Sequence, residues 1–440
     1  MFDASTKLGS WLIKLLAGHP KQIALGLERI SVVAEQLGLP IVDNQVRLGG
    51  KVIVVAGTNG KGSVCAMVER IYSSAGYTTA LYSSPHILKF NERLCLNGEP
   101  LADNHWIEAF EEVEKSRQKI EGCKLTFFEV CTLAAMLVVE KFNPDVSIFE
   151  VGLGGRLDAV NLLDNDCSVL TSIGLDHQSF LGNSIDEIGW EKIHIARSGK
   201  PLIIAEKNLP VSVTEFLKNV SSNVSHLGKD FYFETQGKQW SWFCGDTSRH
   251  GLAFPALRGI HQLINASAAL ATTNALSEDL PISQGAARNG LATVELPARF
   301  QVLAGQPLVI LDVAHNEGAA NMLCKNLDET GFYPRTFGVL GMLRDKDVSS
   351  VYKILRDKID LWFFVDLSYE EAGDRSQTAE AIYKTVKLCD PKMKARCFKK
   401  PEDGFAAAFQ MAKVEDRIVV LGSFITIASV WNEAHKSLKS

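Results

Sequence analysis

Residues 51–63, KVIVVAGTNGKGS, decide the fold of this 440-residue chain. Lys51–Ala56 is an apolar run rich in β-branched residues, which is the pattern of a strand buried on both faces of a parallel sheet. Three glycines and a lysine follow within the next seven residues, and Val64–Ser74 then has a helical pattern. The stretch therefore predicts a buried strand, a glycine-rich turn and a helix in direct succession.

The turn in this stretch carries the groups that bind phosphate. Its backbone amides and the positive end of the following helix can converge on an anion. Lys61 supplies a cation for the β- and γ-phosphates, and Ser63 supplies a hydroxyl for Mg²⁺. The ordinary G-x-x-x-x-G-K-[ST] pattern does not match, since Val55 stands at its first glycine and Gly62 separates lysine from serine. A plain turn is the alternative, but it gives no reason for a lysine between glycines, so the stretch predicts ATP binding.

Alternating strand and helix patterns surround this stretch and predict an α/β fold. Further buried strands are expected at Thr79–Ser83, Asp145–Val151 and Ser168–Ile173, and buried helices at Thr126–Phe142 and Ile260–Leu276. Ser184 and Glu187 form a capping box, which predicts a helix that runs to about Arg197. The aromatic-rich segment Phe231–Cys244 alternates like a hairpin at the rim of the fold.

The strand and helix alternation begins again after a domain boundary expected near Leu296–Arg299. Strands are expected at Leu308–Val313, Phe337–Met342, Leu361–Val365 and Arg417–Leu421, with helices at Gly318–Glu329, Val348–Ile359 and Thr378–Leu388. We therefore expect an N-terminal ATPase domain with a P-loop-type, mostly parallel sheet at 1–297, which also carries the substrate site. A smaller Rossmann-like α/β domain is expected at 298–440. The cleft between the two is the expected site of chemistry.

Composition and charge exclude several classes of protein. Hydrophobic residues make up 46% and charged residues 22%, as in soluble globular proteins and unlike disordered, collagenous or coiled-coil chains. The net charge of −5 offers no basic excess for nucleic acid or an anionic membrane. The nine cysteines include no C-x-x-C pair, and the apolar run Cys131–Val139 is too short to span a bilayer. We expect a cytoplasmic, monomeric enzyme with reduced thiols, acting on small molecules.

Three further residues stand where parallel strands and a capped helix bring side chains to the phosphate loop. Glu150 ends an apolar strand, so its carboxylate is expected at the sheet edge beside the loop, where Mg²⁺ requires oxygen ligands. The alternative is a carboxylate that faces water. His177 follows another expected strand, where a hydrogen-bonded structural histidine is the alternative. Lys192, in the capped helix, by itself fits a solvated surface residue.

The phosphate loop GTNGKGS resembles that of the Mur-type ligase superfamily, whose members join a carboxylate to an amine at the expense of ATP. Within it, the chain is most similar to the bifunctional dihydrofolate synthase/folylpolyglutamate synthase family. The similarity extends over almost the whole chain. Besides the loop, it rests on GLERI at 26–30, SSPHILKFNERLCLNG at 83–98, LTFFE at 125–129, FEVGLGGRLDAVN at 149–161, LDHQSFLGNSIDEIGWEKIHIAR at 175–197, LPARFQV at 296–302 and LDVAHN at 311–316.

The resemblance implies a magnesium site and a modified lysine. Ser84, Glu150 and His177 match the positions that ligate Mg²⁺, and Ser63 contributes beside the nucleotide. Lys192 matches the family's carbamylated lysine, on which CO₂ turns the amine into a carboxylate-like group. An ammonium group repels Mg²⁺, whereas a carbamate binds or orients it. The residues implied in catalysis are Lys61, Glu150, His177, Lys192 and Asp312.

The resemblance also implies the contacts to both substrates. Those to ATP are Gly57, Thr58, Asn59, Gly60, Lys61, Gly62, Ser63, Asn265, Arg299, Asp312 and His315. Those to the pterin substrate are Gly26, Leu27, Glu28, Arg29, Thr126, Phe127, Phe128, Glu129, Leu157, Asp158 and Ala159. The sequence departs from the family at Ala298, where glycine is common. Taken without the resemblance, Arg299 equally fits an interdomain salt bridge, and Phe127–Phe128 fits a helix core.

The reaction that this resemblance implies has two steps. The carboxylate of 7,8-dihydropteroate, or of a folate's terminal glutamate, attacks the γ-phosphate of ATP, and the amine of L-glutamate then attacks the resulting acyl phosphate. A muramyl-peptide ligase of cell-wall synthesis, or a folylpolyglutamate synthase without dihydrofolate synthase activity, is the nearest alternative. A regulatory nucleotide switch or transport ATPase would instead carry an N-K-x-D motif or a standard Walker loop, and neither occurs in the sequence.

Overall fold

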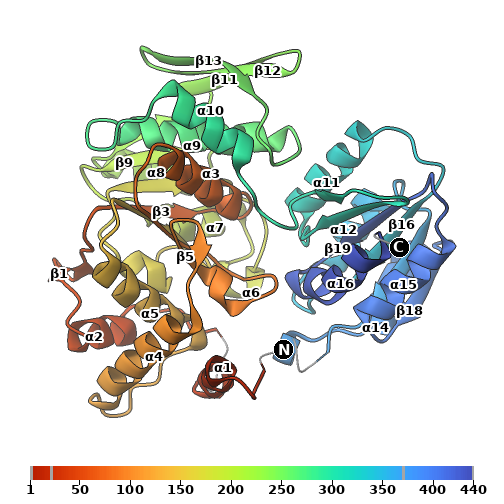
Figure 1. Cartoon of the computed structure of the whole chain (residues 1–440), viewed down its shortest axis with the longest axis horizontal. Helices are drawn as coiled ribbons and strands as arrows, with labels where there is room; N and C mark the ends of the chain where they lie inside the picture. The colour runs from red at the N-terminus through yellow and green to blue at the C-terminus, as the bar shows by residue number, and fades with distance from the viewer. Residues whose placement is uncertain (1–2, 20–22, 369–371, 439–440) are drawn as a thin grey trace.

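The computed structural model describes residues 3–19, 23–368 and 372–438, which form two layered α/β units (Figure 1). In the N-terminal unit, eight strands of the described chain form one sheet in the order β10-β9-β8-β3-β7-β4-β5-β6. They are β3 (Lys51–Ala56), β4 (Thr79–Tyr82), β5 (Leu94–Leu96), β6 (Glu99–Pro100), β7 (Val146–Glu150), β8 (Cys167–Leu170), β9 (Pro201–Ile204) and β10 (Asn223–His226). Neighbours from β10 to β4 pair in parallel, whereas β5 and β6 are antiparallel.

Strand β3 lies inside this sheet and is covered on both faces. Ile53 and Val55 belong to one hydrophobic core, whereas Val52, Val54 and Ala56 belong to the other. The first core contains side chains of α3 (Lys61–Ser74), α9 (His261–Ala275) and α10 (Gln284–Thr293). The second contains side chains of α1 (Lys7–Ala17), α2 (Glu28–Gln36), α4 (Asp103–Gln118) and α5 (Phe127–Phe142). This two-sided burial is why the strand sequence is continuously apolar.

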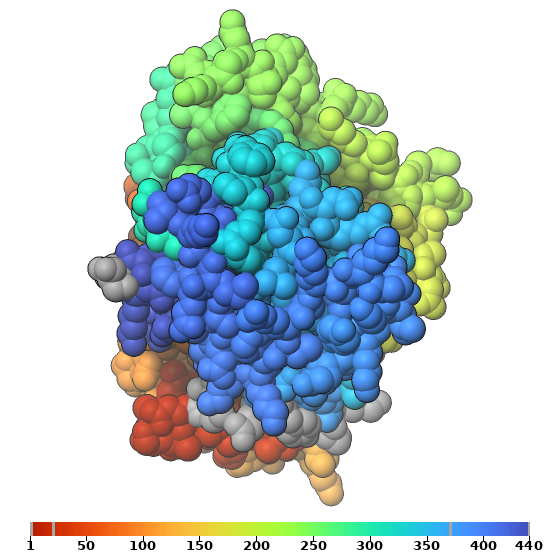
Figure 2. Space-filling model, turned by 90° about the vertical axis from the view of Figure 1, so that its right-hand side faces the viewer, coloured from red at the N-terminus to blue at the C-terminus, as the bar shows by residue number. Residues whose placement is uncertain are grey.

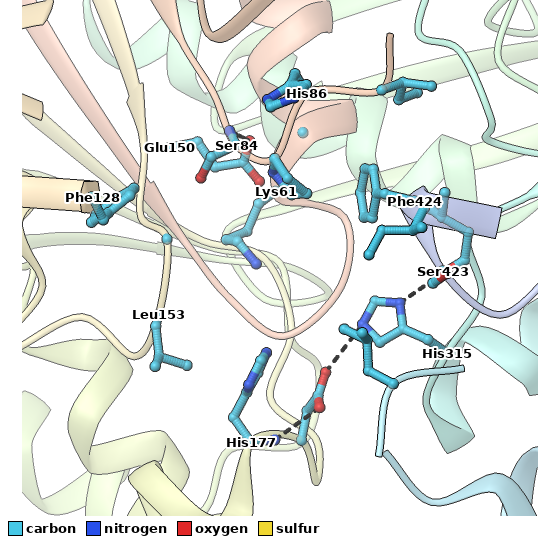
Figure 3. A pocket seen from close by; sticks show the side chains of 18 of the residues that line it. Lys61, Ser84, His86, Phe128, Glu150, Leu153, His177, His315, Ser423 and Phe424 are labelled. Carbon is cyan, nitrogen blue, oxygen red and sulfur yellow. Dashed lines mark hydrogen bonds and ion pairs between the residues drawn. The ribbon is translucent and has the colours of Figure 1, made fainter. Parts of the chain in front are cut away.

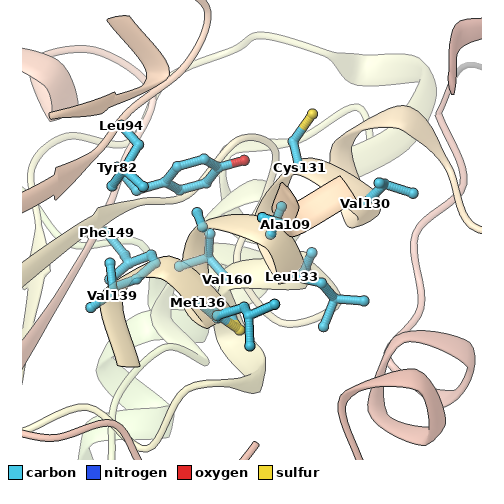
Figure 4. Close-up of a cluster of buried hydrophobic side chains, with 14 of the residues drawn as sticks. Tyr82, Leu94, Ala109, Val130, Cys131, Leu133, Met136, Val139, Phe149 and Val160 are labelled. Carbon is cyan, nitrogen blue, oxygen red and sulfur yellow. The ribbon is translucent and has the colours of Figure 1, made fainter. Parts of the chain in front are cut away.

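Helix α5 fills the middle of the second core. Its residue Val139 is fully buried, as are Phe149 of β7 and Tyr82 of β4, and all three belong to the cluster drawn in Figure 4. A capping box starts the helix: the Thr126 hydroxyl accepts from the Glu129 amide, and the Glu129 carboxylate accepts from the Thr126 amide. This cap fixes the direction in which the chain enters the helix.

In the C-terminal unit, the described strands form a second sheet in the order β14-β15-β19-β16-β17-β18. They are β14 (Gln301–Leu303), β15 (Leu308–Asp312), β16 (Thr336–Leu340), β17 (Leu361–Val365), β18 (Ala395–Phe398) and β19 (Arg417–Leu421), and β14 alone of these pairs antiparallel. Helices α11 (Glu317–Glu329), α12 (Val348–Leu355) and α14 (Ala379–Cys389) cover one face. Helices α15 (Pro401–Met411) and α16 (Phe424–Ser437) cover the other.

Among the described residues, the N-terminal unit also contains two small sheets and three further α-helices, two of which pack on the main sheet at β8 and β9. They are β1 (Ile41–Val42), β2 (Gln45–Val46), β11 (Phe231–Gln236), β12 (Gln239–Cys244), β13 (Thr247–Ala253), α6 (Gln178–Leu181), α7 (Ile185–Ile193) and α8 (Val211–Asn219). In the space-filling view the C-terminal unit lies over the centre of the N-terminal unit, and β11–β13 project beyond it (Figure 2). Across the described ranges, each helix is too short or too polar to cross a membrane.

The expected α/β fold with a mostly parallel N-terminal sheet is confirmed, the C-terminal sheet is mixed because β14 is antiparallel, and several elements differ in detail. Strands β3, β17 and β19 have the bounds expected from sequence. The hairpin expected at Phe231–Cys244 is extended by a third strand, β13. Helix α7 ends at Ile193 instead of near Arg197, because the Ile195 carbonyl accepts from the side chains of Asn165 and Ser168 and leaves the helix direction.

The contact between α10 and α3 gives a test of the packing. A Cβ on Gly290 would lie 2.6 Å from the Ile71 Cα, whereas one on Gly285 meets only the Ser283 hydroxyl at 3.7 Å. We expect Gly290→Ala to lower the free energy of unfolding by about 1–3 kcal/mol, because two helix backbones must separate. Gly285→Ala, on the same helix, is the control and should leave it unchanged or raise it by up to about 1 kcal/mol. Urea unfolding of both variants would contradict this packing if they were equally stable.

Candidate active site

Both units line one cavity of about 1740 Å³, into which the carboxyl ends of their parallel strands open. The phosphate loop enters it after β3, Glu150 from the end of β7, Asp312 from the end of β15 and Ser423 after β19. Figure 3 shows Lys61, Ser84 and Glu150 together on one side, with Ser423 and other residues of the C-terminal unit on the opposite side. This edge of a parallel sheet is where α/β proteins bind ligands.

The phosphate loop is held in a form that requires its glycines. Gly57 has φ +151°, and a Cβ there would lie 1.9 Å from the Thr171 hydroxyl oxygen. The amide of Thr58 donates to the Ser172 carbonyl at 2.8 Å, and that of Asn59 donates to the Ser172 hydroxyl at 2.9 Å. Because α3 begins at Lys61, its first amides have no partner within the helix and open toward the cavity. The loop therefore has the form of an anion site.

Two lysines meet at one carbonyl oxygen of this loop. The Nζ of Lys61 donates to the Gly57 carbonyl at 3.0 Å, and the Nζ of Lys192 donates to the same oxygen at 3.2 Å. Lys192 is only 4% exposed. Burial, with the charge of Lys61 added to it, lowers the pKa of Lys192 to about 7. Near neutral pH, the Lys192 amine is therefore neutral in a large fraction of the molecules. Its burial also shows that the alternative of a solvated surface residue is wrong.

Glu150 is a buried carboxylate beside the loop. It is 6% exposed, and its Oε2 accepts from the Ser84 amide at 3.3 Å. A Cβ on Gly62 would lie 3.7 Å from the same oxygen, so the carboxylate directly faces the loop. Burial raises the pKa of Glu150, while the charges of Lys61 and Arg299 oppose this rise. The alternative of a carboxylate that faces water is therefore wrong.

The donors around Glu150 fit Mg²⁺. In the described part of the chain, no three His, Cys, Asp or Glu side chains are grouped so as to hold a metal ion by themselves. Mg²⁺ does not need such a cage, since it prefers one or two carboxylates completed by hydroxyls, water and phosphate oxygens. The buried hydroxyl of Ser63, in the first turn of α3, lines the same cavity as Glu150 and Ser84. These residues therefore suit a metal bound together with a nucleotide.

His177 is engaged with the C-terminal unit. Its Nε2 lies 3.2 Å from the Nζ of Lys346, which also donates to Asp176 at 2.5 Å. Burial and the charge of Lys346 lower the pKa of His177 to about 3. Against the effect of its burial, the hydrogen bond from His315 and the charge of Lys346 hold the pKa of Asp176 well below its usual range. The predicted role of His177 as a metal ligand stays a prediction.

Sequence reasoning missed Lys346. It lies in the loop between β16 (Thr336–Leu340) and α12, and therefore lacks the strand-end position that singled out Glu150. Its side chain is 5% exposed and crosses from the C-terminal unit to Asp176 in the N-terminal unit. The two residues are 170 positions apart, so nothing in the local sequence indicates the pair.

The segment that joins the two units carries Arg299 into the cavity. Burial lowers the pKa of Arg299, and the charges of Asp312 and Glu150 oppose this. Its Nη1 is buried without a hydrogen-bond partner, which suits an incoming anion such as phosphate. Asp312 accepts from the amides of Phe300 and Ala314, both at 2.8 Å. Arg299 therefore lies near one carboxylate of each unit, Glu150 and Asp312. An interdomain salt bridge, the alternative considered from sequence, would require the same placement.

The same segment is strained at the two residues that flank Arg299. Ala298 has φ +58° and Phe300 has φ +47°, both in the left-handed region that favours glycine. The Ala298 amide donates to the Gln301 side chain at 2.9 Å, and the Phe300 amide is fixed by Asp312. These contacts hold the strained backbone and present Arg299 between them.

An apolar wall with two buried acids, Glu129 and Asp158, lines the part of the cavity predicted to hold the pterin. Phe127 and Phe128 open α5, and Gly152 leaves room for the Phe128 ring, since a Cβ there would lie 2.6 Å from its Cζ. Asp158 is 2% exposed and accepts from the amides of Leu153 and Val160. Burial raises its pKa to about 6. This wall suits a flat ring with polar edges.

Four of the predicted site residues lie outside the cavity lining, namely Gly26, Leu27, Glu28 and Arg29. The other predicted residues all line it. Arg29 pairs with Glu129 at 2.8 Å and donates to the Ala24 carbonyl, while the Gly26 amide donates to the Leu157 carbonyl at 3.1 Å. Residues 23–25 form this part of the wall instead. The GLERI segment thus supports the lining residues Glu129 and Leu157 through these contacts. Its own contact with substrate stays a prediction.

Comparison with known proteins agrees with this site. The Mur ligase middle domain family matches residues 55–273, and the Mur ligase glutamate ligase domain family matches residues 298–424. The dihydrofolate synthase/folylpolyglutamate synthase of Escherichia coli K12 is 36% identical over 97% of this chain and 96% of its own. That of Bacillus subtilis 168 is 30% identical, over 85% of this chain and 87% of its own.

Solved structures agree as well. Escherichia coli FolC in complex with DHPP and ADP superposes with a TM-score of 0.89 at 36% identity, covering 100% of both chains. A bifunctional folylpolyglutamate synthase/dihydrofolate synthase with Mn, AMPPNP and L-glutamate bound superposes with a TM-score of 0.87 at 36% identity, covering 98% of this chain and 99% of that one.

The fold and the cavity define the class of this protein as an ATP-dependent carboxylate–amine ligase of the Mur type. Relatives at 33–36% identity over nearly the full length narrow the class further. The chain belongs to the dihydrofolate synthase/folylpolyglutamate synthase family.

Proposed function

We propose that this chain adds L-glutamate to 7,8-dihydropteroate, forming dihydrofolate, and to tetrahydrofolates, forming polyglutamates, with ATP as co-substrate. The observation that carries the proposal is one cavity that combines a phosphate loop, a buried carboxylate and an aromatic wall. Relatives with both activities in their names, and their complexes with ADP, AMPPNP and L-glutamate, support it. The nine free thiols support a cytoplasmic enzyme, and we propose a monomer.

In the first step the substrate carboxylate attacks the γ-phosphate, ADP leaves, and an acyl phosphate forms. The loop amides and Lys61 hold the triphosphate, and Arg299 faces it with its unpartnered Nη1. These charges offset the repulsion between a carboxylate and a triphosphate. Ser63, Ser84, Glu150 and His177 are the residues proposed to hold Mg²⁺, which would supply further neutralisation of phosphate charge.

In the second step the amine of glutamate attacks the acyl carbon, phosphate leaves, and the amine loses a proton as the amide forms. The C-terminal unit forms one wall of the cavity with Asp312, His315 and Ser423, so it is placed to exclude water from the acyl phosphate. The ring of the substrate would lie against Phe128 and Asp158. Asn265, which lines the cavity beside Gly60, is proposed to contact the adenine.

An ADP-release assay tests this proposal. With dihydropteroate, and separately with tetrahydrofolate, we expect ADP release that depends on glutamate. Lys61→Ala should lower kcat/KM by about 100-fold or more, because a cation that faces the transferred phosphate is lost. Lys141→Ala removes an exposed lysine paired with Glu112 and is the matched control, with unchanged kinetics.

Other outcomes of this assay assign the alternatives. Turnover with tetrahydrofolate alone indicates a folylpolyglutamate synthase without the first activity. Turnover only with a UDP-sugar substrate indicates a muramyl-peptide ligase. Nucleotide binding that is equal in the wild type and in Lys61→Ala would contradict the role of the loop.

We also propose that Lys192 is carbamylated. The reaction needs the neutral amine, whose nitrogen attacks CO₂ and releases one proton. The lowered pKa of about 7 provides this amine at neutral pH, whereas below pH 7 the ammonium dominates and the carbamate is lost. Activity at fixed bicarbonate should therefore fall below about pH 7, and CO₂-free buffer should inactivate the enzyme until bicarbonate is added. Lys192→Gln should show no response to bicarbonate. A native mass without the added CO₂ at saturating bicarbonate would contradict the modification.

A further inference from the structure

The side chain of Asn316 joins three parts of the active site. It follows β15, is 5% exposed and caps α11, since its Oδ1 accepts from the Ala319 amide at 2.9 Å. The same Oδ1 accepts from the Asn59 Nδ2 at 3.1 Å. Its Nδ2 donates to the Asn59 Oδ1 at 3.1 Å and to the Asp176 Oδ2 at 3.0 Å. One carboxamide of the C-terminal unit thus contacts both the phosphate loop and the turn before α6.

These contacts use the full hydrogen-bonding capacity of the carboxamide. An asparagine side chain has two lone pairs on oxygen and two hydrogens on nitrogen, and all four have a partner here. The orientation of the amide is also fixed, because its oxygen faces a backbone N–H and its nitrogen faces a carboxylate. Aspartate lacks the donors and serine lacks the reach. Such a saturated buried network holds one relative position of its parts.

Asn59, the partner in the loop, is itself held firmly. Its carbonyl accepts from the hydroxyls of Thr171 at 2.7 Å and Ser172 at 3.0 Å. Helix α11 of the C-terminal unit packs closely on the Asn59 side chain, since a Cβ on Gly318 would lie 3.0 Å from the Asn59 Nδ2. The amide pair therefore forms only when the loop has this shape and α11 lies directly on it. Asn59, predicted as an ATP contact, here directs its side chain to the C-terminal unit.

We infer that Asn316 is a positioning residue that couples the phosphate loop to closure of the C-terminal unit, so that glutamate meets the acyl phosphate before water does. The inference rests on the proposed ligase function. Its physical basis is that the Asn59–Asn316 pair links the two units at the loop itself, whereas Lys346 links them at Asp176 and His177, outside the loop. Loss of the Asn59–Asn316 pair should leave nucleotide binding intact, and the C-terminal unit should no longer close on the phosphate loop.

The test compares the ADP released with the amide formed. In Asn316→Ala we expect the ratio of ADP to amide product to rise from about one to several, and the KM for glutamate to rise about 10-fold, as the loss of hydrogen bonds to a closed state implies. The dissociation constant of ATP should stay within about 2-fold, because the amides of the loop and Lys61 are untouched. A merely structural role would lower all activities together and leave the ratio at one.

Two variants separate coupling from helix capping. Asn316→Asp keeps an excellent N-cap but cannot donate to Asn59 and sets a carboxylate against Asp176. Coupling predicts that it behaves like the alanine variant, whereas capping predicts wild-type behaviour. Thr378→Ala removes the N-cap of α14 in the same unit and should keep a ratio of one. In a double-mutant cycle of Asn316→Ala with Asn59→Ala, the effects of the two single changes on the ratio of ADP to amide should not be additive, because both remove the same contact.

The outcomes are distinct. If Asn316→Asp is folded, with one ADP per amide and an unchanged KM for glutamate, the inference is overturned. If the alanine variant does not fold, the aspartate variant, with its cap intact, decides. Absence of glutamate-dependent ADP release in the wild type with either acceptor overturns the proposed function instead, and that result does not depend on any Asn316 variant.

Discussion

The carbonyl oxygen of Gly57 accepts hydrogen bonds from two lysine side chains, and the active site depends on the electrostatic cost of holding two positive charges this close together. Two lysines held at 3.0 and 3.2 Å from one oxygen repel each other, and one of them is buried. Such an arrangement costs free energy unless an anion shares it. A triphosphate bound in the loop supplies that anion. The backbone geometry of Gly57, which packs against Thr171, thus determines where the phosphates bind. It also contributes to the lowered pKa of Lys192, because it holds the two lysines together.

The cavity has walls from both units because the carboxyl ends of the parallel strands of both sheets face it. The carboxyl ends of β3 and β7 bring the loop and Glu150, and the end of β15 brings Asp312. The short connection between the units passes between these ends and is strained at Ala298 and Phe300. Strained backbone persists where surrounding contacts determine it, and here the contacts are those of the site. The position of Arg299 and the relative placement of the units are therefore fixed by the same few residues.

Local sequence was sufficient for the features that depend on local physics. Strands such as β3 were predicted with the observed bounds because burial on both faces leaves an unbroken apolar run. Glu150 was recognised because a polar residue at the end of such a run projects from the sheet edge. Residues that meet through tertiary packing gave no such signal. Lys346 reaches Asp176 across 170 positions, and the wall at 23–25 took the place expected for Gly26–Arg29.

The protonation of the buried groups shows how the cavity acts on its substrates. Burial raises the pKa of Glu150, Asp158 and Asp312, and it lowers the pKa of Lys192 and Arg299. Burial in the cavity therefore disfavours the charged form of acids and bases alike. The same poorly solvated surroundings strengthen each interaction with a substrate phosphate or carboxylate. Groups that are costly to bury are thus stabilised by the charges of the reacting molecules, which is how binding energy is directed to the transfer of phosphate.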